Sequence, residues 1–169
     1  MQLIFVLETN KKCKSDWIYI KDTIEYFYNI DANNIKFTQV YMDGKGNFKN
    51  KQKEINKNID QYAKGASNGN SKVICCLDSD DYDINMEAIK FLNEAFKFCN
   101  DNKYELIWFC KDIERVYLRK KVVKDEKKKE AGKFKANKTI RNIDAKNLVA
   151  SKYKDGTCLL YTSPSPRDR

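Results

Sequence analysis

Residues 72–83, KVICCLDSDDYD, join a predicted buried strand to a cluster of acidic residues. The first half, 72–77, is a short apolar run with β-branched residues, which is typical of a strand inside a parallel sheet. The second half, 78–83, holds four aspartates in six residues. Ligands of α/β sheets bind where the strands end at their carboxyl edge. This stretch therefore predicts a parallel sheet and also the edge at which a functional site would lie.

On both sides of this stretch, apolar runs alternate with amphipathic segments. The runs predict further strands at 2–7, 35–41 and 104–110, and the segments predict helices at 15–28, 50–64 and 86–99. Strands that alternate with helices of this length favour right-handed crossovers and helices on both faces of the sheet. The sequence therefore predicts an α/β fold, a three-layer Rossmann-like domain with a mostly parallel four-stranded sheet.

The composition of the 169 residues restricts the class of protein. The length fits one domain, or one domain plus an appendage, and with 41% hydrophobic and 34% charged residues we expect one core under a heavily charged surface. The apolar runs are too short to cross a bilayer, and the N-terminus lacks the layout of a signal peptide. The six cysteines include no Cys-x-x-Cys pair, which is typical of reduced, structural thiols. We expect a cytoplasmic protein with no membrane partner.

The chain contains no histidine. This absence excludes serine–histidine and cysteine–histidine catalytic arrangements and histidine-ligated zinc sites. Acid–base or metal chemistry would therefore use carboxylates, lysine, tyrosine or cysteine.

The end of the chain differs abruptly in composition from the rest. Residues 158–168, CLLYTSPSPRD, resemble the conceptual translation of a transposon-type sequencing adaptor, the alternative being an ordinary polar tail. We therefore expect three parts: an α/β domain at 1–118, a basic, lysine-rich and truncated C-terminal extension at 119–157, and a non-native tail at 158–169 that is excluded from fold and function.

Carboxylates directly follow two of the predicted strands. Glu8 follows the first strand, and Asp78 and Asp80 follow the third, where a two-residue period would point both aspartates the same way. Because parallel strands end at one edge, we expect the three carboxylates to lie close together. Such hard oxygen ligands favour Mg²⁺ or Mn²⁺, which would neutralise their mutual repulsion. The alternative is that the acidic loop caps the next helix, whose dipole favours carboxylates.

The order of these residues resembles the toprim family of topoisomerases, primases and nucleases. Glu8 matches the glutamate after the first strand, and Asp78 and Asp80 match the Asp-x-Asp after the third, over residues 1–118. The nearest likeness is to the toprim nucleases of bacterial defence systems, the RloB-like and overcoming-lysogenization-defect groups. The resemblance implies a toprim-like fold and a Mg²⁺-dependent nuclease or related phosphodiester-processing enzyme that acts on DNA or RNA in bacterial defence. It also implies a partner ATPase or a homo-oligomer as candidate assemblies.

The resemblance also implies roles for individual residues. The candidate metal ligands are Glu8, Asp16, Asp78, Asp80 and Glu114, of which Glu8 either completes the metal site or shuttles a proton. The catalytic candidates are Glu8, Asp78, Asp80 and Lys111, the lysine being the nearest in sequence that would stabilise the leaving oxygen.

A basic region follows the fourth predicted strand. Residues 111–141 contain 13 lysines and arginines against five acidic residues, which is eight of the net nine positive charges. Such a patch indicates a polyanionic partner, because phosphate contacts supply most non-specific affinity for nucleic acid. The candidate nucleic-acid-binding residues are Arg115, Arg119, Lys120, Lys121, Lys124, Lys133 and Lys135. The alternative is an ordinary solvated lysine-rich face. We expect residues 124–135 to be a charged loop, or a helix that orders on substrate.

Two other functions stay open. One is a non-catalytic α/β module that binds nucleic acid or a protein through its basic half, an alternative supported by Thr9, which stands where toprim proteins usually have glycine after the glutamate. The other is a nucleotide-sugar glycosyltransferase, whose metal-binding stretch resembles residues 77–81 but whose other usual motifs are missing here.

Overall fold

Four parallel strands form the centre of the protein in the order β2-β1-β3-β4. The structure, a computed structural model, describes residues 1–28, 30, 34–65 and 69–148. The strands are β1 (Gln2–Leu7), β2 (Lys36–Tyr41), β3 (Ser71–Asp78) and β4 (Glu105–Phe109). The helices are α1 (Ser15–Phe27), α2 (Gln52–Gly65), α3 (Met86–Asn102), α4 (Ile113–Leu118) and α5 (Lys127–Ala136). Short 3-10 turns lie at η1 (Lys49–Lys51), η2 (Lys124–Glu126), η3 (Thr139–Asn142) and η4 (Ala145–Leu148). The predicted α/β sheet is confirmed, and all its pairings are parallel.

The register of the sheet decides which side chains meet at its carboxyl edge. In β1, Leu7 pairs with Tyr41 of β2 on one side and with Cys76 of β3 on the other. Because Leu7 lies opposite Cys76, Glu8, the residue after β1, lies beside the last residues of β3. The end of β3 in turn pairs with Phe109 of β4.

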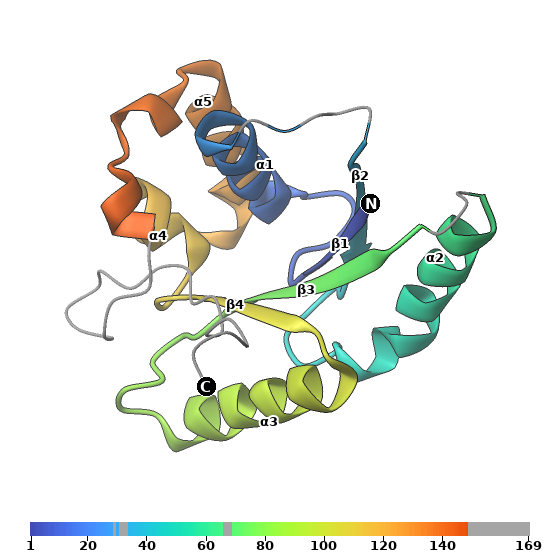
Figure 1. Cartoon of the computed structure of the whole chain (residues 1–169). Coiled ribbons are helices and arrows are strands. Elements are labelled where there is room, and N and C mark those ends of the chain that lie inside the picture. The colour runs from blue at the N-terminus through green and yellow to red at the C-terminus, as the bar shows by residue number, and fades with distance from the viewer. Residues whose placement is uncertain (29, 31–33, 66–68, 149–169) are drawn as a thin grey trace.

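Helices cover both faces of the sheet, so the domain has three layers (Figure 1). Successive residues of a strand point to opposite faces. In β1, Phe5 and Leu7 accordingly belong to the core beneath α1, α4 and α5, whereas Ile4 and Val6 belong to the core beneath α2 and α3. Full burial of an aliphatic or aromatic side chain of this size contributes about 1.5–3 kcal/mol, and both faces of β1 are lined with such side chains.

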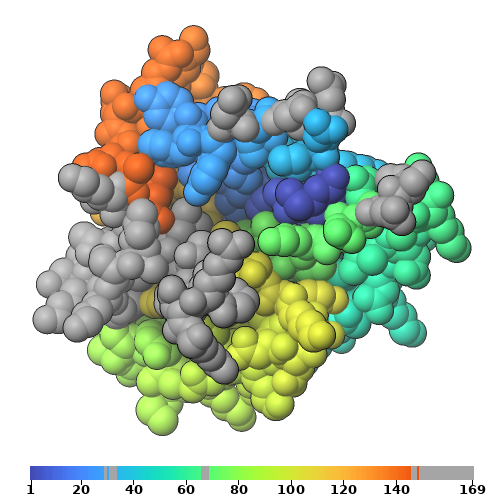
Figure 2. All heavy atoms as spheres, viewed as in Figure 1, coloured from blue at the N-terminus to red at the C-terminus, as the bar shows by residue number. Residues whose placement is uncertain are grey.

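The described part of the basic extension belongs to the same core as the sheet. The ring of Phe134 in α5 lies 4.9 Å from that of Tyr19 in α1 and 5.6 Å from that of Tyr117 in α4. Phe134 and Ala131 are buried in the core that also contains Phe5. Figure 2 shows α1 and the C-terminal described residues packed side by side. Residues 124–135 thus fold as a turn and a docked helix, while 149–157 and the tail at 158–169 lie outside the described residues.

Two helix starts differ in how they are capped. Lys14, with a left-handed backbone and no side-chain cap, precedes α1. Asn85 caps α3, because its Oδ1 accepts hydrogen bonds from the backbone N–H groups of Glu87 and Ala88 at 2.9 and 3.3 Å.

Among the described residues, none of the helices combines the length and the apolar character needed to cross a bilayer.

Candidate functional site

Glu8 and Asp78 meet at the carboxyl edge of the two central strands. The Oε2 atom of Glu8, directly after β1, accepts a hydrogen bond from the backbone N–H of Asp78, the last residue of β3, at 3.1 Å. The predicted proximity of these two residues is confirmed. The register explains it, because Leu7, the last residue of β1, pairs with Cys76, two residues before the end of β3.

Asp16 joins these residues from the first turn of α1. Its Oδ2 atom accepts a hydrogen bond from the backbone N–H of Thr9 at 3.2 Å, and its Oδ1 atom accepts one from the Ser15 hydroxyl at 3.2 Å. Asp78 Oδ1 in turn accepts a hydrogen bond from the backbone N–H of Ile113 at 3.0 Å. Each carboxylate is therefore oriented by the backbone of a different segment.

The three carboxylates line one cavity of about 650 Å³, which we call the carboxylate pocket. Its lining residues are Glu8, Thr9, Asn10, Lys12, Cys13, Asp16, Asp43, Gly44, Asp78, Lys124, Asp125, Lys127 and Lys128.

Burial and mutual repulsion disfavour the charged forms of these carboxylates. The pKa of Glu8 is raised from 4.5 to about 7, mainly by burial and further by Asp16, against the opposing hydrogen bond from the Asp78 backbone. Burial also raises the pKa of Asp16, an effect that Lys127 opposes. The pKa of Asp78 lies well above its usual range because of burial and then the charges of Glu8 and Asp16. The pocket therefore favours the uptake of protons or of a cation.

Lys127 supplies a half-buried positive charge that the sequence did not identify. Its Nζ atom lies 2.9 Å from Oε2 of Glu114, a fully buried residue of α4. Burial disfavours the charge of Lys127, but Glu114, Asp78 and Asp16 together raise its pKa. Lys127 is one of three consecutive lysines, so no local pattern distinguishes it from the other two.

Two buried polar atoms next to this ion pair have no hydrogen-bond partner among the described residues: Oε1 of Glu114 and the hydroxyl of Tyr19. Burial raises the pKa of Tyr19, and the charges of Glu114 and Asp16 also contribute, so the phenol stays protonated. Unpaired buried polar atoms indicate room for water or an ion.

The donor set of the carboxylate pocket fits a hard divalent cation. In the described part of the chain, no three acidic or cysteine side chains form a ready-made metal-binding group. Mg²⁺ does not need one, because it usually binds through one or two carboxylates and keeps several waters. Glu8, Asp16 and Asp78 provide such carboxylates, whereas Glu114, also predicted as a metal ligand, does not line this pocket and pairs with Lys127.

Asp80 does not line the carboxylate pocket, although Asp78 does. Strand β3 ends at Asp78, and Asp80 has a left-handed backbone with φ of 49°, in an isolated antiparallel bridge with Lys111. The predicted common direction of the two aspartates is wrong, because the two-residue period requires extended backbone. The Asp80 carboxylate forms an ion pair with Lys45 instead, although its charge still contributes to the raised pKa of Glu8.

Asp80 and Lys111 line a second cavity of about 610 Å³, which we call the flanking pocket. Its lining residues are Lys45, Asp80, Asp81, Asn85, Glu87, Ala88, Phe91, Lys111, Asp112, Arg115 and Lys121. The lysine predicted to assist the carboxylates therefore lines the neighbouring cavity, and Lys127 occupies the carboxylate pocket in its place. The acidic loop is not the side-chain cap of α3, because Asn85 has that role.

The predicted nucleic-acid-binding residues separate into three groups. Arg115 and Lys121 line the flanking pocket, and Lys124 lines the carboxylate pocket. Lys120 and Lys133 both form ion pairs with Glu130. The other two, Arg119 and Lys135, are exposed and line neither pocket.

Comparison of the chain with family models, curated proteins and solved structures finds no match.

Proposed function

We propose that this protein is a Mg²⁺-dependent phosphodiester-processing enzyme, a nuclease acting on DNA or RNA, with the carboxylate pocket as its active site. The observation that carries the proposal is the convergence of Glu8, Asp16 and Asp78 on one cavity that four lysines also line. Carboxylates with raised pKa values attract a divalent cation, and basic side chains beside them attract a polyanion.

The residues of the pocket fit the chemistry of phosphodiester cleavage. Mg²⁺ or Mn²⁺, when bound by Glu8, Asp16 and Asp78, would neutralise charge on the phosphodiester and activate the attacking water. Backbone N–H groups hold all three carboxylates in place, so little reorganisation is needed on binding. Lys127 brings an ammonium group to the same cavity, where it can contact a non-bridging phosphate oxygen.

Three further lysines, Lys12, Lys124 and Lys128, line the carboxylate pocket. Their charges would draw a nucleic acid toward the carboxylates, which alone would repel it. A role in bacterial defence and a partner ATPase or homo-oligomer rest on the toprim resemblance alone.

A non-catalytic nucleic-acid-binding module is the second candidate. It is favoured by the lack of a ready-made metal-binding group among the described residues and by the basic residues of the flanking pocket. Such a module would bind nucleic acid equally well with or without a divalent cation.

Cleavage and metal binding by Asp78→Asn test the proposal. Labelled single-stranded DNA, duplex DNA and RNA are incubated with Mg²⁺, Mn²⁺ or a chelator, and Mg²⁺ binding is followed by calorimetry. Asp60→Asn is the matched control, because Asp60 is an exposed residue of α2. We expect Asp78→Asn to lose Mg²⁺-dependent cleavage and to bind Mg²⁺ more weakly, with Asp60→Asn unchanged. Wild-type cleavage by Asp78→Asn, or cleavage that persists in chelator, would overturn the proposal.

A further inference from the structure

Four cations line the flanking pocket, one from the loop after β2 and three from the stretch around α4. Lys45 follows β2, Lys111 follows β4, Arg115 lies in α4, and Lys121 follows α4. Lys111, Arg115 and Lys121 lie close together in the sequence, and the fold brings Lys45 to them from the loop after β2.

Two of these four cations already have acidic partners. Lys45 pairs with Asp80, and Arg115 Nε lies 3.2 Å from Oδ2 of Asp112. Lys111 and Lys121 form no ion pair with another described residue. The pocket therefore presents two ammonium groups whose charge no carboxylate of the described chain neutralises directly.

The remaining lining limits the charge of a ligand. Asp80, Asp81, Glu87 and Asp112 also line the cavity, so its formal charges balance. A triphosphate, with several negative charges, would be repelled by these carboxylates. One phosphodiester group carries a single negative charge, which two ammonium groups can bind directly.

One wall of the flanking pocket is apolar. The ring of Phe91 lines the cavity, and Lys45 Nζ lies 4.5 Å from its centroid, which holds that ammonium at the wall by a cation–π contact. A sugar beside the phosphate could rest against this ring. Charge and shape thus fit one nucleotide within a chain.

Hydrogen bonds between the segment 79–80 and Lys111 fix the backbone at the boundary between the two pockets. Ser79 is fully buried, and its hydroxyl accepts a hydrogen bond from the backbone N–H of Lys111 at 3.0 Å. The backbone N–H of Asp80 donates to the carbonyl oxygen of Lys111 at 2.8 Å. Asp78 on one side of Ser79 lines the carboxylate pocket, and Asp80 on the other side lines the flanking pocket. Neighbouring positions in β3 and its exit therefore enter neighbouring cavities.

We propose that the flanking pocket binds the phosphodiester group next to the one held at the carboxylate pocket, through Lys111 and Lys121, so that the substrate is a polynucleotide chain and not a mononucleotide. This inference rests on the proposed function, because the carboxylate pocket defines the neighbouring phosphate. The contact itself is electrostatic and needs no divalent cation.

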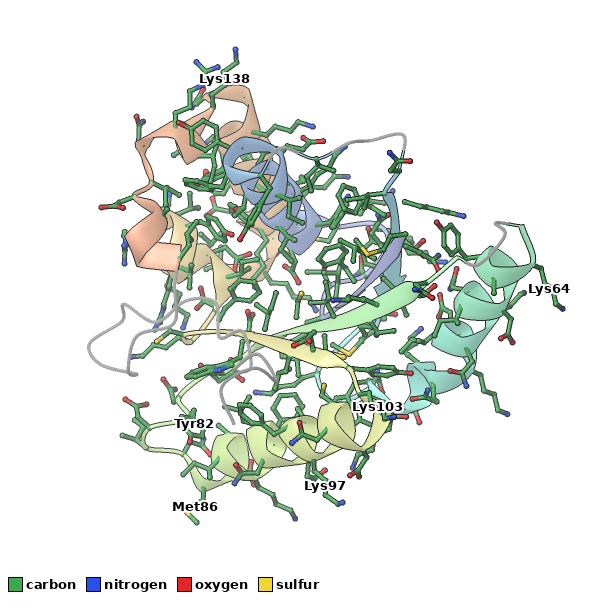
Figure 3. All side chains as sticks on the ribbon, viewed as in Figure 1. Lys64, Tyr82, Met86, Lys97, Lys103 and Lys138 are labelled. Atoms are coloured by element: carbon green, nitrogen blue, oxygen red, sulfur yellow. The ribbon has the colours of Figure 1, made fainter. Side chains whose placement is uncertain are left out.

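The test measures binding of a fluorescent single-stranded DNA of about 12 nucleotides in chelator, by anisotropy over a range of salt. The variant is Lys111→Gln with Lys121→Gln. The control is Lys64→Gln with Lys103→Gln, which removes the same charge at the ends of α2 and α3, away from the pocket. Figure 3 shows Lys64 and Lys103 there, while Tyr82 and Met86 mark the opposite end of α3. Lys121→Gln alone is included, because Lys121 is exposed and its replacement does not disturb the left-handed backbone at Lys111.

We expect the double variant to bind the DNA roughly tenfold more weakly at low salt, and its salt slope to fall by about 1.4, as for two lost contacts to a single strand. Lys121→Gln should show about half of that change in slope, and the control should bind like the wild type. A mononucleotide should compete poorly with the labelled strand. Equal weakening by the control, an unchanged Lys121→Gln, or competition by a mononucleotide at the concentration of the oligonucleotide would overturn the inference.

The metal-free readout separates this inference from the proposed function. Binding that depends on Lys111 and Lys121 without any cleavage in Mg²⁺ would leave the flanking pocket standing and reject the nuclease. Mg²⁺-dependent cleavage, together with DNA binding that does not depend on Lys111 and Lys121, would support the nuclease and reject the role of the flanking pocket.

Discussion

The carboxylate pocket and the flanking pocket lie side by side, yet they hold their charges in different ways. Asp78 lies in the first and has a pKa well above its usual range because of burial and two neighbouring carboxylates. Asp80 lies in the second, with about half of its side chain exposed and Lys45 as its partner. One serine separates them in sequence. Burial and local backbone geometry, and not residue type, therefore decide how each aspartate holds its charge.

The largest difference between the pockets should appear in catalysis. We expect Asp78→Asn to lower the Mg²⁺-dependent cleavage rate by about three orders of magnitude, because a bound metal supplies several kcal/mol. Asp80→Asn should lower the same rate by only roughly tenfold, because the charge of Asp80 acts on the carboxylate pocket from a distance. Initial rates on the preferred substrate measure both. Equal losses in the two variants would contradict the separation of the pockets.

Stability against pH should also distinguish the pockets. The pKa of Glu8 is raised from 4.5 to about 7 in the folded protein. As the pH rises between these values, the unfolded chain loses the proton first, so the metal-free fold loses about 3 kcal/mol of stability from this group. Denaturant unfolding in chelator, from about pH 5 to about pH 8, measures the loss.

Two substitutions assign this pH dependence. Glu8→Gln should flatten the part of the slope that comes from Glu8, and Asp80→Asn should leave most of it. Added Mg²⁺ should restore stability at the alkaline end and have little effect at the acidic end. A metal-free protein that gains stability as the pH rises through this range would contradict the buried charge assigned to Glu8.

The smallest expected effect concerns Lys127 and has opposite signs for two ligands. Lys127→Gln removes a cation from the carboxylate pocket, so Mg²⁺ should bind several-fold more tightly, while single-stranded DNA in the presence of Ca²⁺ should bind more weakly. Lys127→Arg should restore both affinities toward the wild type. Calorimetry and anisotropy measure the two ligands.

Lys129→Gln is the control for this pair of measurements, because Lys129 is exposed and lines neither pocket. If Lys127 had a purely structural role, Lys127→Gln would weaken the binding of both Mg²⁺ and single-stranded DNA. That outcome would remove the lysine from the proposed site.

Most of the sheet and part of the site were accessible from the sequence. The strand at 2–7 has the predicted bounds, and the exit residues Glu8 and Asp78 meet as expected. The position of Asp80 was not accessible, because it depends on a bridge to Lys111, more than 30 residues away. The partition of the basic region among two pockets and an exposed face was also hidden, since every lysine there looks alike in a charged run.

The sequence by itself determined the alternation of strands and helices, the parallel sheet and the acidic residues at its carboxyl edge. Those features follow from local periodicity and from the handedness of crossovers, which short segments carry on their own. Only the tertiary structure decided that Lys127 enters the carboxylate pocket, because α5 is held there by Phe134 against Tyr19 and Tyr117. Contacts between distant segments determine which of the three consecutive lysines lines the pocket, and the local sequence does not distinguish them.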